Sequence, residues 1–247
     1  MNSKIESMKK ITLRIAFVLG VSIFLLGIPK IASLITDWFD FRNVDSDATF
    51  AWISVHHVIQ TVLFVPLFFL VKGFKKDVKF HLGVGHWRKG LKYVLIFTAI
   101  FLGYTIVVFG ISLLTNTFVQ YQFPLTAKNV LGYLGFQLFL SGPSEEFIFR
   151  AFAITVFSLM IGSRVFKGRV SAANLIAAII FGLAHVGFSF SPFELRYSIT
   201  QVFYAIGLGL IYGDCYERTE SVLYPMMLHS ISNVISVGAT MLLTFLI

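Results

Sequence analysis

Charged residues and cysteine are scarce in this chain. Only 13% of the 247 residues are charged, whereas 57% are hydrophobic, and the mean hydropathy is +0.82. This composition lies outside the range of soluble globular domains. The single cysteine, Cys215, excludes an internal disulfide and a cysteine-cluster metal site. We therefore interpret the sequence as an integral membrane protein that crosses the bilayer several times.

Apolar runs long enough to cross a bilayer predict an all-α, polytopic transmembrane bundle of about seven to eight helices. The first run follows several lysines, as a signal peptide would, but it is long and has no convincing cleavage site, so we expect a retained anchor. The runs cover residues 11–35, 50–71, 93–115, 130–161, 172–190, 198–213 and 222–247.

The net charge of +8 comes from short basic clusters between the apolar runs. Such clusters are orientation signals rather than a nucleic-acid surface. We expect the clusters at residues 4–14, 72–92 and 164–169 to be cytoplasmic, and residues 37–47 and 116–127 to be external. The sequence thus predicts a multi-pass protein of the cell membrane with a cytoplasmic amino terminus. The lipid bilayer is a predicted partner and nucleic acid is not.

The stretch SGPSEEFIFR places two adjacent glutamates inside the fourth run. About 34 residues of helix would span roughly 50 Å, which is too long for one straight crossing of a core about 30 Å thick. Proline removes a backbone donor and kinks a helix. We therefore expect Gly142 and Pro143 to break the run, so that Glu145 and Glu146 open a new helical segment inside the membrane.

The two glutamates differ in their sequence neighbours. Glu146 and Arg150 are four residues apart, on one helix face and in the favourable acid-first order. This pair could serve helix packing alone. Glu145 is rotated by about 100° from Glu146 and has no basic partner on its own face. Because an ionisable group within a transmembrane segment is a candidate functional residue, we expect Glu145 to react and the pair to support it.

Polar residues also interrupt two later runs. His185 lies near the middle of residues 172–190, and His229 and Asn233 share one face of the last run. A single buried histidine is usually a packing residue, and asparagine often joins transmembrane helices. Together with a carboxylate, however, these groups are of the types that activate water and stabilise an oxyanion.

The other histidines and two nearby serines are not assigned to a site. Ser144 and Ser230 lack the G-x-S-x-G context of a nucleophilic serine. Packing or solvent exposure is the expected role of the remaining histidines, His56, His57, His81 and His86.

Three motifs resemble those of the CPBP intramembrane proteases, which include the CAAX prenyl endopeptidases and the bacterial Abi proteins linked to bacteriocin processing and self-immunity. EEFIFR fits E-E-x-x-x-R, FGLAH fits F-x-x-x-H and HSISN fits H-x-x-x-N, in the family's order. The resemblance divides the chain into amino-terminal transmembrane helices (1–128) and a catalytic core (129–247). It implies roles for Glu145, Glu146, Arg150, His185, His229 and Asn233.

The resemblance implies an enzyme that hydrolyses a peptide bond in a membrane-associated peptide or protein. A water held between Glu145 and His185 would attack the scissile carbonyl, while His229 and Asn233 would donate to the oxyanion. We expect no required cofactor. Zinc remains open, since two histidines and a glutamate resemble a catalytic zinc site, although asparagine is a poor zinc ligand.

Two other classes of function remain open. A non-catalytic immunity factor or scaffold would use the motif residues for stability. A small proton-coupled transporter would use glutamate and histidine as a proton relay, although no internal repeat is visible. A peptide-cleavage assay separates the protease from both. The expected substrate is a short hydrophobic or signalling peptide precursor, because no prenyl-recognition signature is found.

Overall fold

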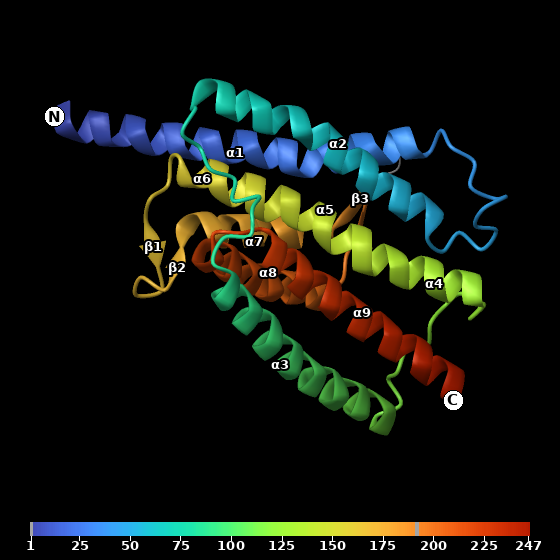
Figure 1. The fold of residues 1–247 in the computed structure, drawn as a ribbon. Coiled ribbons are helices and arrows are strands. Elements are labelled where there is room, and N and C mark those ends of the chain that lie inside the picture. The colour runs from blue at the N-terminus through green and yellow to red at the C-terminus, as the bar shows by residue number, and fades with distance from the viewer. Residues whose placement is uncertain (1, 191–192) are drawn as a thin grey trace.

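The computed structural model describes residues 2–190 and 193–247, and the chain forms a bundle of helices (Figure 1). The predicted all-α class is confirmed, and the number of helices roughly agrees with expectation. In chain order the helices are α1 (Asn2–Thr36), α2 (Ala51–Phe74), α3 (Trp87–Leu114), α4 (Ala127–Phe136), the π-helix η1 (Gln137–Ser141), α5 (Gly142–Glu146), the π-helix η2 (Phe147–Ile154), α6 (Thr155–Ser158), α7 (Ala172–Ala184), α8 (Ile199–Thr219) and α9 (Leu223–Leu246).

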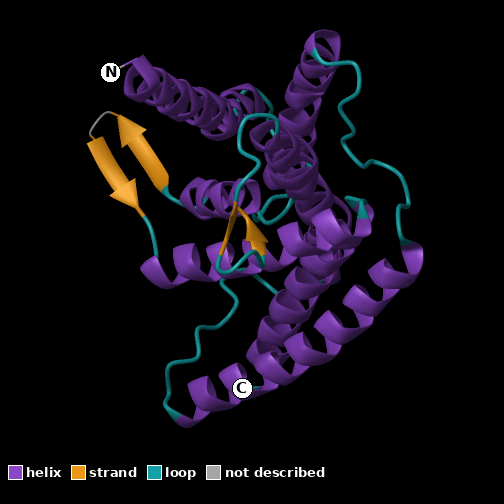
Figure 2. Cartoon of the chain, turned by 90° about the vertical axis from the view of Figure 1, so that its left-hand side faces the viewer, coloured by secondary structure: helices purple, strands orange, loops and turns teal. Residues whose placement is uncertain are grey.

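Strands within the described residues are confined to two short antiparallel hairpins (Figure 2). The first pairs β1 (Arg164–Val165) with β2 (Val170–Ser171). The second pairs β3 (Gly187–Phe190) with β4 (Phe193–Arg196). Neither hairpin forms a layer of the fold, so helix packing alone positions the interior.

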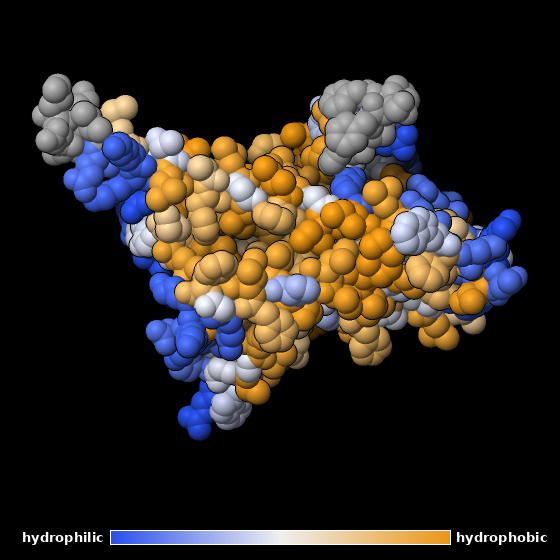
Figure 3. Space-filling model, turned by 90° about the horizontal axis from the view of Figure 1, so that it is seen from above, coloured by the Kyte–Doolittle hydropathy of each residue, from blue (hydrophilic) through white to orange (hydrophobic). Residues whose placement is uncertain are grey.

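Four helices of the described chain are long and apolar enough to cross a membrane. They are α2, α3, α9 and residues Met8–Thr36 of α1. Many of their large apolar side chains are exposed, and Figure 3 shows hydrophobic residues across the middle of one face, with hydrophilic residues at its two ends. Such an exposed apolar band matches the hydrocarbon core of a bilayer. The composition and the fold thus agree on a membrane protein.

Segments predicted to share a side of the membrane lie at the same end of the molecule (Figure 1). The amino terminus, the α2–α3 connection and the β1–β2 hairpin form what we call the basic end. The α1–α2 and α3–α4 connections lie at the opposite, acidic end. At the basic end, the N–H of Val222 donates to the carbonyl of His81 (2.9 Å). The structure is consistent with the predicted alternation of loops between the two sides of the membrane. Which end faces the cytoplasm stays a prediction.

The predicted break at Gly142 and Pro143 is replaced by a change of helix type. The helical path continues from Ala127 to Ser158 through η1, α5 and η2. Proline cannot donate to the helix ladder, and its ring crowds the carbonyl four residues earlier. The wider π-helical turn of η1 lies directly before this proline, as expected where the regular hydrogen-bond ladder is interrupted. The glutamates therefore end α5 rather than open a separate helix.

The fifth predicted run is wrong at its carboxyl end. Helix α7 ends at Ala184, His185 occupies its C-cap, and β3 follows. Residues Gly187 to Phe190 alternate apolar and polar side chains after a glycine, a pattern typical of a strand. Hydropathy alone does not distinguish this pattern from helix. At 13 residues, α7 is too short to cross the bilayer alone.

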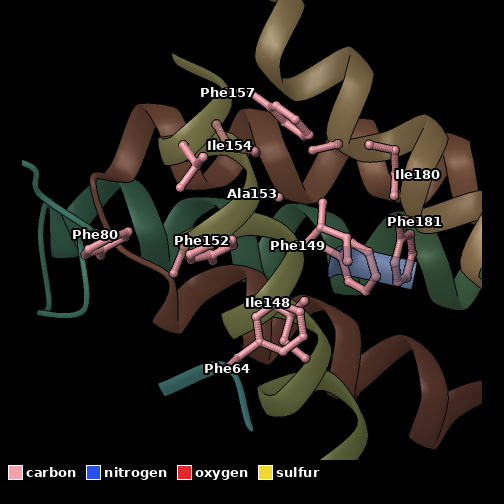
Figure 4. Close-up of a cluster of buried hydrophobic side chains, with 14 of the residues drawn as sticks. Phe64, Phe80, Ile148, Phe149, Phe152, Ala153, Ile154, Phe157, Ile180 and Phe181 are labelled. Carbon is pink, nitrogen blue, oxygen red and sulfur yellow. The ribbon is translucent and has the colours of Figure 1, made fainter. Parts of the chain in front are cut away.

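The main core surrounds η2 (Figure 4). Every residue from Ile148 to Ile154 is buried, so η2 is covered on all sides. Its phenylalanines pack against Phe64 of α2 and Phe181 of α7. The core thus joins residues from both sides of the predicted division between 1–128 and 129–247, a division that stays a prediction.

Candidate active site

A glycine lets α5 approach α9 closely. A Cβ atom on Gly142 would lie 2.7 Å from Oγ and 2.9 Å from the backbone nitrogen of Ser230. Any larger residue would force the two helices apart. This contact brings the glutamates at the end of α5 to the histidine face of α9.

Ser144 attaches the other side of α5 to α2. Its hydroxyl accepts from Gln60 Nε2 (2.8 Å) and Thr61 Oγ1 (2.7 Å), and it donates to the carbonyl of His57 (3.1 Å). These bonds occupy the hydroxyl fully. Ser144 therefore positions α5 between α2 and α9.

Glu146 is fully buried and has a partner on each carboxylate oxygen. Arg150 Nε lies 2.9 Å from Oε2, and His229 Nδ1 lies 2.8 Å from Oε1. The arginine contact is an ion pair rather than an aligned hydrogen bond. Its guanidinium faces the rings of Phe181 (4.5 Å) and Tyr212 (5.5 Å), which favour a cation. The predicted Glu146–Arg150 pair is present, and it also orients His229.

Glu145 has a different partner and is partly accessible. Its side chain is 19% exposed, whereas that of Glu146 is 0% exposed. Oε1 of Glu145 lies 3.2 Å from Nε2 of His57. Because the Ile53 carbonyl can only accept, Nδ1 of His57 must be its donor (2.8 Å). Favourable contact between Nε2 and Oε1 therefore requires a proton between them, and the pair is arranged for proton transfer.

The sequence interpretation of His57 as a packing residue missed this contact. His57 and Glu145 are 88 residues apart, and only the packing of α2 on α5 brings them together. Its neighbour His56 does behave as a packing residue, since its ring stacks on Trp52 at 5.2 Å. A histidine inside a transmembrane run is itself a functional signal, and it could have identified His57.

His185 and His229 occupy different positions in the candidate site. His229 lies against Glu146. Nδ1 of His185 donates to the Phe181 carbonyl (2.9 Å), which leaves Nε2 as its second functional atom. Among residues 2–190 and 193–247, no direct hydrogen bond or ion pair joins His185 to Glu145.

Asn233 lies on the same α9 face and contacts η1. Its Nδ2 donates to Gln137 Oε1 (2.8 Å) and Ser141 Oγ (3.0 Å). Both amide hydrogens are therefore engaged, and donation to an oxyanion would require Asn233 to exchange one of these bonds. Gln137 was not identified from the sequence, although it is a lone polar residue in an apolar run.

The described part of the chain offers no ready metal site. Within it, no three histidine, cysteine, aspartate or glutamate side chains are grouped so as to hold a metal ion. Glu145, His185 and His229 are not grouped as metal ligands in this part of the chain.

Comparison with known proteins places this region in a family. Residues 127–235 match the family model described as type II CAAX prenyl endopeptidase Rce1-like. The match confirms the resemblance drawn from the three motifs, and residues 127–235 are a CPBP-family region. No curated protein and no solved structure matches the chain. The matched family supports, in general terms, a CAAX-type intramembrane protease.

Proposed function

We propose that this protein is an endopeptidase that uses Glu145 as a general base on water. One observation carries the proposal: Glu145 is partly accessible and lies 3.2 Å from His57 Nε2, whereas Glu146 is buried with both oxygens engaged. A general base must reach its water and exchange a proton with it. Only Glu145 of the adjacent pair meets both conditions.

In the proposed reaction, Glu145 takes a proton from a water that also contacts His185. The water oxygen forms a bond to the scissile carbonyl carbon, and the negative charge moves to the carbonyl oxygen. His229, held at Nδ1 by Glu146, donates from Nε2 to that oxyanion, with Asn233 as a second donor. The carbon–nitrogen bond then breaks, and the proton held by Glu145 passes to the leaving nitrogen.

The proposed substrate is a membrane-associated peptide or protein, with a short hydrophobic or signalling precursor preferred. The reaction as proposed uses no cofactor. Metal analysis of the purified protein, with activity measured before and after chelation, tests this point: stoichiometric zinc with chelator-sensitive cleavage would contradict it. The immunity, scaffold and transporter alternatives predict no cleavage at all.

The matched pair Glu145→Gln and Glu146→Gln tests the assignment. Cleavage of a fluorogenic membrane peptide in liposomes and the melting temperature are measured for each variant. Glu145→Gln should abolish cleavage with an unchanged melting temperature. Glu146→Gln should leave Arg150 as an uncompensated buried charge, which costs about 3 to 5 kcal/mol, and so reduce melting temperature, abundance and activity.

Two other outcomes for these variants would contradict the assignment. A stable but inactive Glu146→Gln beside an active Glu145→Gln would reverse the two roles. If both variants were stable and active, the proposed protease mechanism would be wrong.

A further inference from the structure

A cavity lies between α3 and α8, and none of the candidate catalytic residues lines it. Its volume is about 1010 Å³, which is in the range of ligand-binding sites. The side chains of Ile100 and Ile211 line it and are 67% and 44% exposed, so the cavity is open toward the surrounding lipid. Helix α3 lies at the edge of the bundle (Figure 1).

The shape of the cavity follows from close packing at the start of α3 and a glycine further along α8. At the start of α3, a Cβ atom on Gly90 would overlap the ring of Tyr224, so this end is held tightly against α9. The hydroxyl of Tyr93 also donates to Asp214 (2.5 Å). Further along the cavity, a Cβ atom on Gly207 would meet nothing within 4 Å. The cavity is therefore closed at the basic end and widens into the membrane.

The basic end of the cavity carries unpaired positive charge. Arg218 is paired with Asp214 (2.8 Å), and His86 lies 3.8 Å from Glu220. A further lining carboxylate, Glu217, accepts from the Ser171 hydroxyl. Lys89 and Lys92 line the same end, and neither has an ion-pair partner within the described residues. These two lysines are three residues apart on α3, so they share a face. Two free ammonium groups thus lie at the closed, basic end of an apolar cavity.

The length of the cavity matches one leaflet of a bilayer. From Lys89 to Tyr104, both of which line it, α3 advances roughly 22 Å at about 1.5 Å per residue. Half of a bilayer with its headgroups measures about 20 to 22 Å. An occupant with a negative group at one end and an apolar chain of this length fits the charge and the shape.

We propose that this cavity binds one anionic membrane phospholipid. The phosphate lies between Lys89 and Lys92, and an acyl chain runs along Ile96, Ile100 and Leu208. Basic pockets between transmembrane helices bind anionic headgroups in this way. The proposal concerns a site distinct from the catalytic group and does not depend on the proposed reaction.

Native mass spectrometry of the full chain tests the charged end. The protein is released from nanodiscs that contain phosphatidylglycerol and phosphatidylcholine with the same acyl chains. The native chain should retain one phosphatidylglycerol in preference to phosphatidylcholine. Lys89→Gln/Lys92→Gln should weaken this retention about 30-fold, since each lysine near an anionic lipid contributes several-fold. The control, Lys75→Gln/Lys76→Gln, removes equal charge from exposed positions outside the cavity and should retain the lipid.

A second pair of variants tests the apolar part. Gly207→Leu places a side chain inside the cavity and should reduce lipid retention. Gly103→Leu adds the same side chain on α3, where a Cβ atom also meets nothing within 4 Å, but outside the cavity lining, and should leave retention unchanged. Equal retention of the two lipids, unchanged retention after Lys89→Gln/Lys92→Gln, or occupation by a second copy or a peptide in place of lipid would overturn the proposal.

Discussion

Adjacent residues of α5 occupy different environments because one step along a helix rotates a side chain by about 100°. Glu146 faces α9, from which His229 contacts one carboxylate oxygen, while Arg150 of η2 contacts the other. Glu145 faces α2, where His57 lies 3.2 Å away. A pair of identical side chains thus supplies one buried, structurally fixed carboxylate and one accessible carboxylate. This difference follows from packing on two helices.

His57→Phe tests whether the contact on the α2 side supports catalysis. The variant leaves Glu145 without the imidazole that contacts it. We expect kcat for peptide cleavage to fall about 10- to 100-fold, as for partners that orient a catalytic group, with little change in KM. Steady-state kinetics in liposomes gives both constants.

His56→Phe is the matched control, because this neighbouring ring stacks on Trp52 and does not contact Glu145 within the described structure. It should keep kcat near that of the native chain. An equal loss in both variants would assign the effect to the packing of α2. Partial recovery in His57→Gln, whose amide can still donate to Glu145, would support the specific contact.

Residue contacts were predictable from the sequence only where the partners lie on one helix. The spacing of Glu146 and Arg150 was sufficient to predict their ion pair. The contacts of His57 and Gln137 depend on how separate helices pack, and no local pattern encodes that arrangement. The family resemblance named the histidines and Asn233, but it did not extend to α2.

At the scale of elements, the close approach of α5 to α9 depends on Gly142. In Gly142→Ala, the new Cβ atom would lie 2.7 Å from Ser230 Oγ. We expect the helices to separate, with a loss of about 1 to 3 kcal/mol in stability as for other overpacked sites, and a weakened Glu146–His229 bond. Thermal unfolding in detergent and peptide cleavage measure the two effects.

Gly135→Ala provides the control on the same helical path. A Cβ atom there would meet nothing within 4 Å, so alanine should be neutral or stabilising by up to about 1 kcal/mol through its helix propensity. If Gly142→Ala were as stable and active as Gly135→Ala, close approach would not be what positions Glu146.

The helical elements were largely predictable because apolar runs of this length have few alternatives in a membrane. The exceptions are places where hydropathy does not distinguish a strand from a helix or a π-helix from an α-helix. Gly187 to Phe190 is as apolar as a helix but forms β3. The π-helical turns around Pro143 also leave no hydropathy signal, since they change hydrogen bonding rather than composition.

The carboxylate of Asp45 binds the backbone at the start of α2, and its contribution to stability depends on pH. Its carboxylate accepts from the N–H groups of Thr49 (3.0 Å), Phe50 (2.6 Å) and Ala51 (2.7 Å). Burial raises the pKa of Asp45, but these bonds outweigh burial and hold its pKa below the ordinary value. The unfolded chain therefore binds the proton more readily. The stability from Asp45 is present above pH of about 4 and is lost as pH falls through the lowered pKa.

Asp45→Asn should reduce stability by about 1.5 to 3 kcal/mol at neutral pH, the usual contribution of hydrogen bonds to a charged group. The difference from the native chain should shrink below pH of about 4. Melting temperatures of both proteins across pH 3 to 8 measure this. Asp40→Asn, at an exposed carboxylate that contacts only Arg42 among the described residues, should show no such difference. A pH-independent effect of Asp45→Asn would contradict the role of its charge.

At the scale of the whole molecule, the site draws on more of the chain than the family region. The match covers residues 127–235, yet α2 lies outside it and supplies His57. The α2–α3 connection is also bonded to the end of α8, where the His86 N–H donates to the carbonyl of Thr219 (2.7 Å). The amino-terminal helices therefore help to position the helices that carry the proposed catalytic residues.

The orientation of the whole bundle can be tested at its two ends. Single cysteines are placed at Arg42, at the acidic end, and at Lys167, at the basic end; both positions are exposed. Because basic clusters remain in the cytoplasm, we expect a membrane-impermeant maleimide to label position 42 in intact cells and position 167 only after permeabilisation. The native Cys215 is fully buried, so it should give little background.

The two sites test the number of crossings as well as the direction. Between positions 42 and 167 the chain passes through α2, α3 and the path from α4 to α6. An odd number of crossings puts the two positions on opposite sides. Labelling of both positions from outside would mean that the chain crosses the membrane an even number of times between them. That result would contradict the prediction that α2, α3 and the path from α4 to α6 each cross once. Labelling of position 167 alone would invert the bundle and place the lysines of the α3–α8 cavity in the outer leaflet.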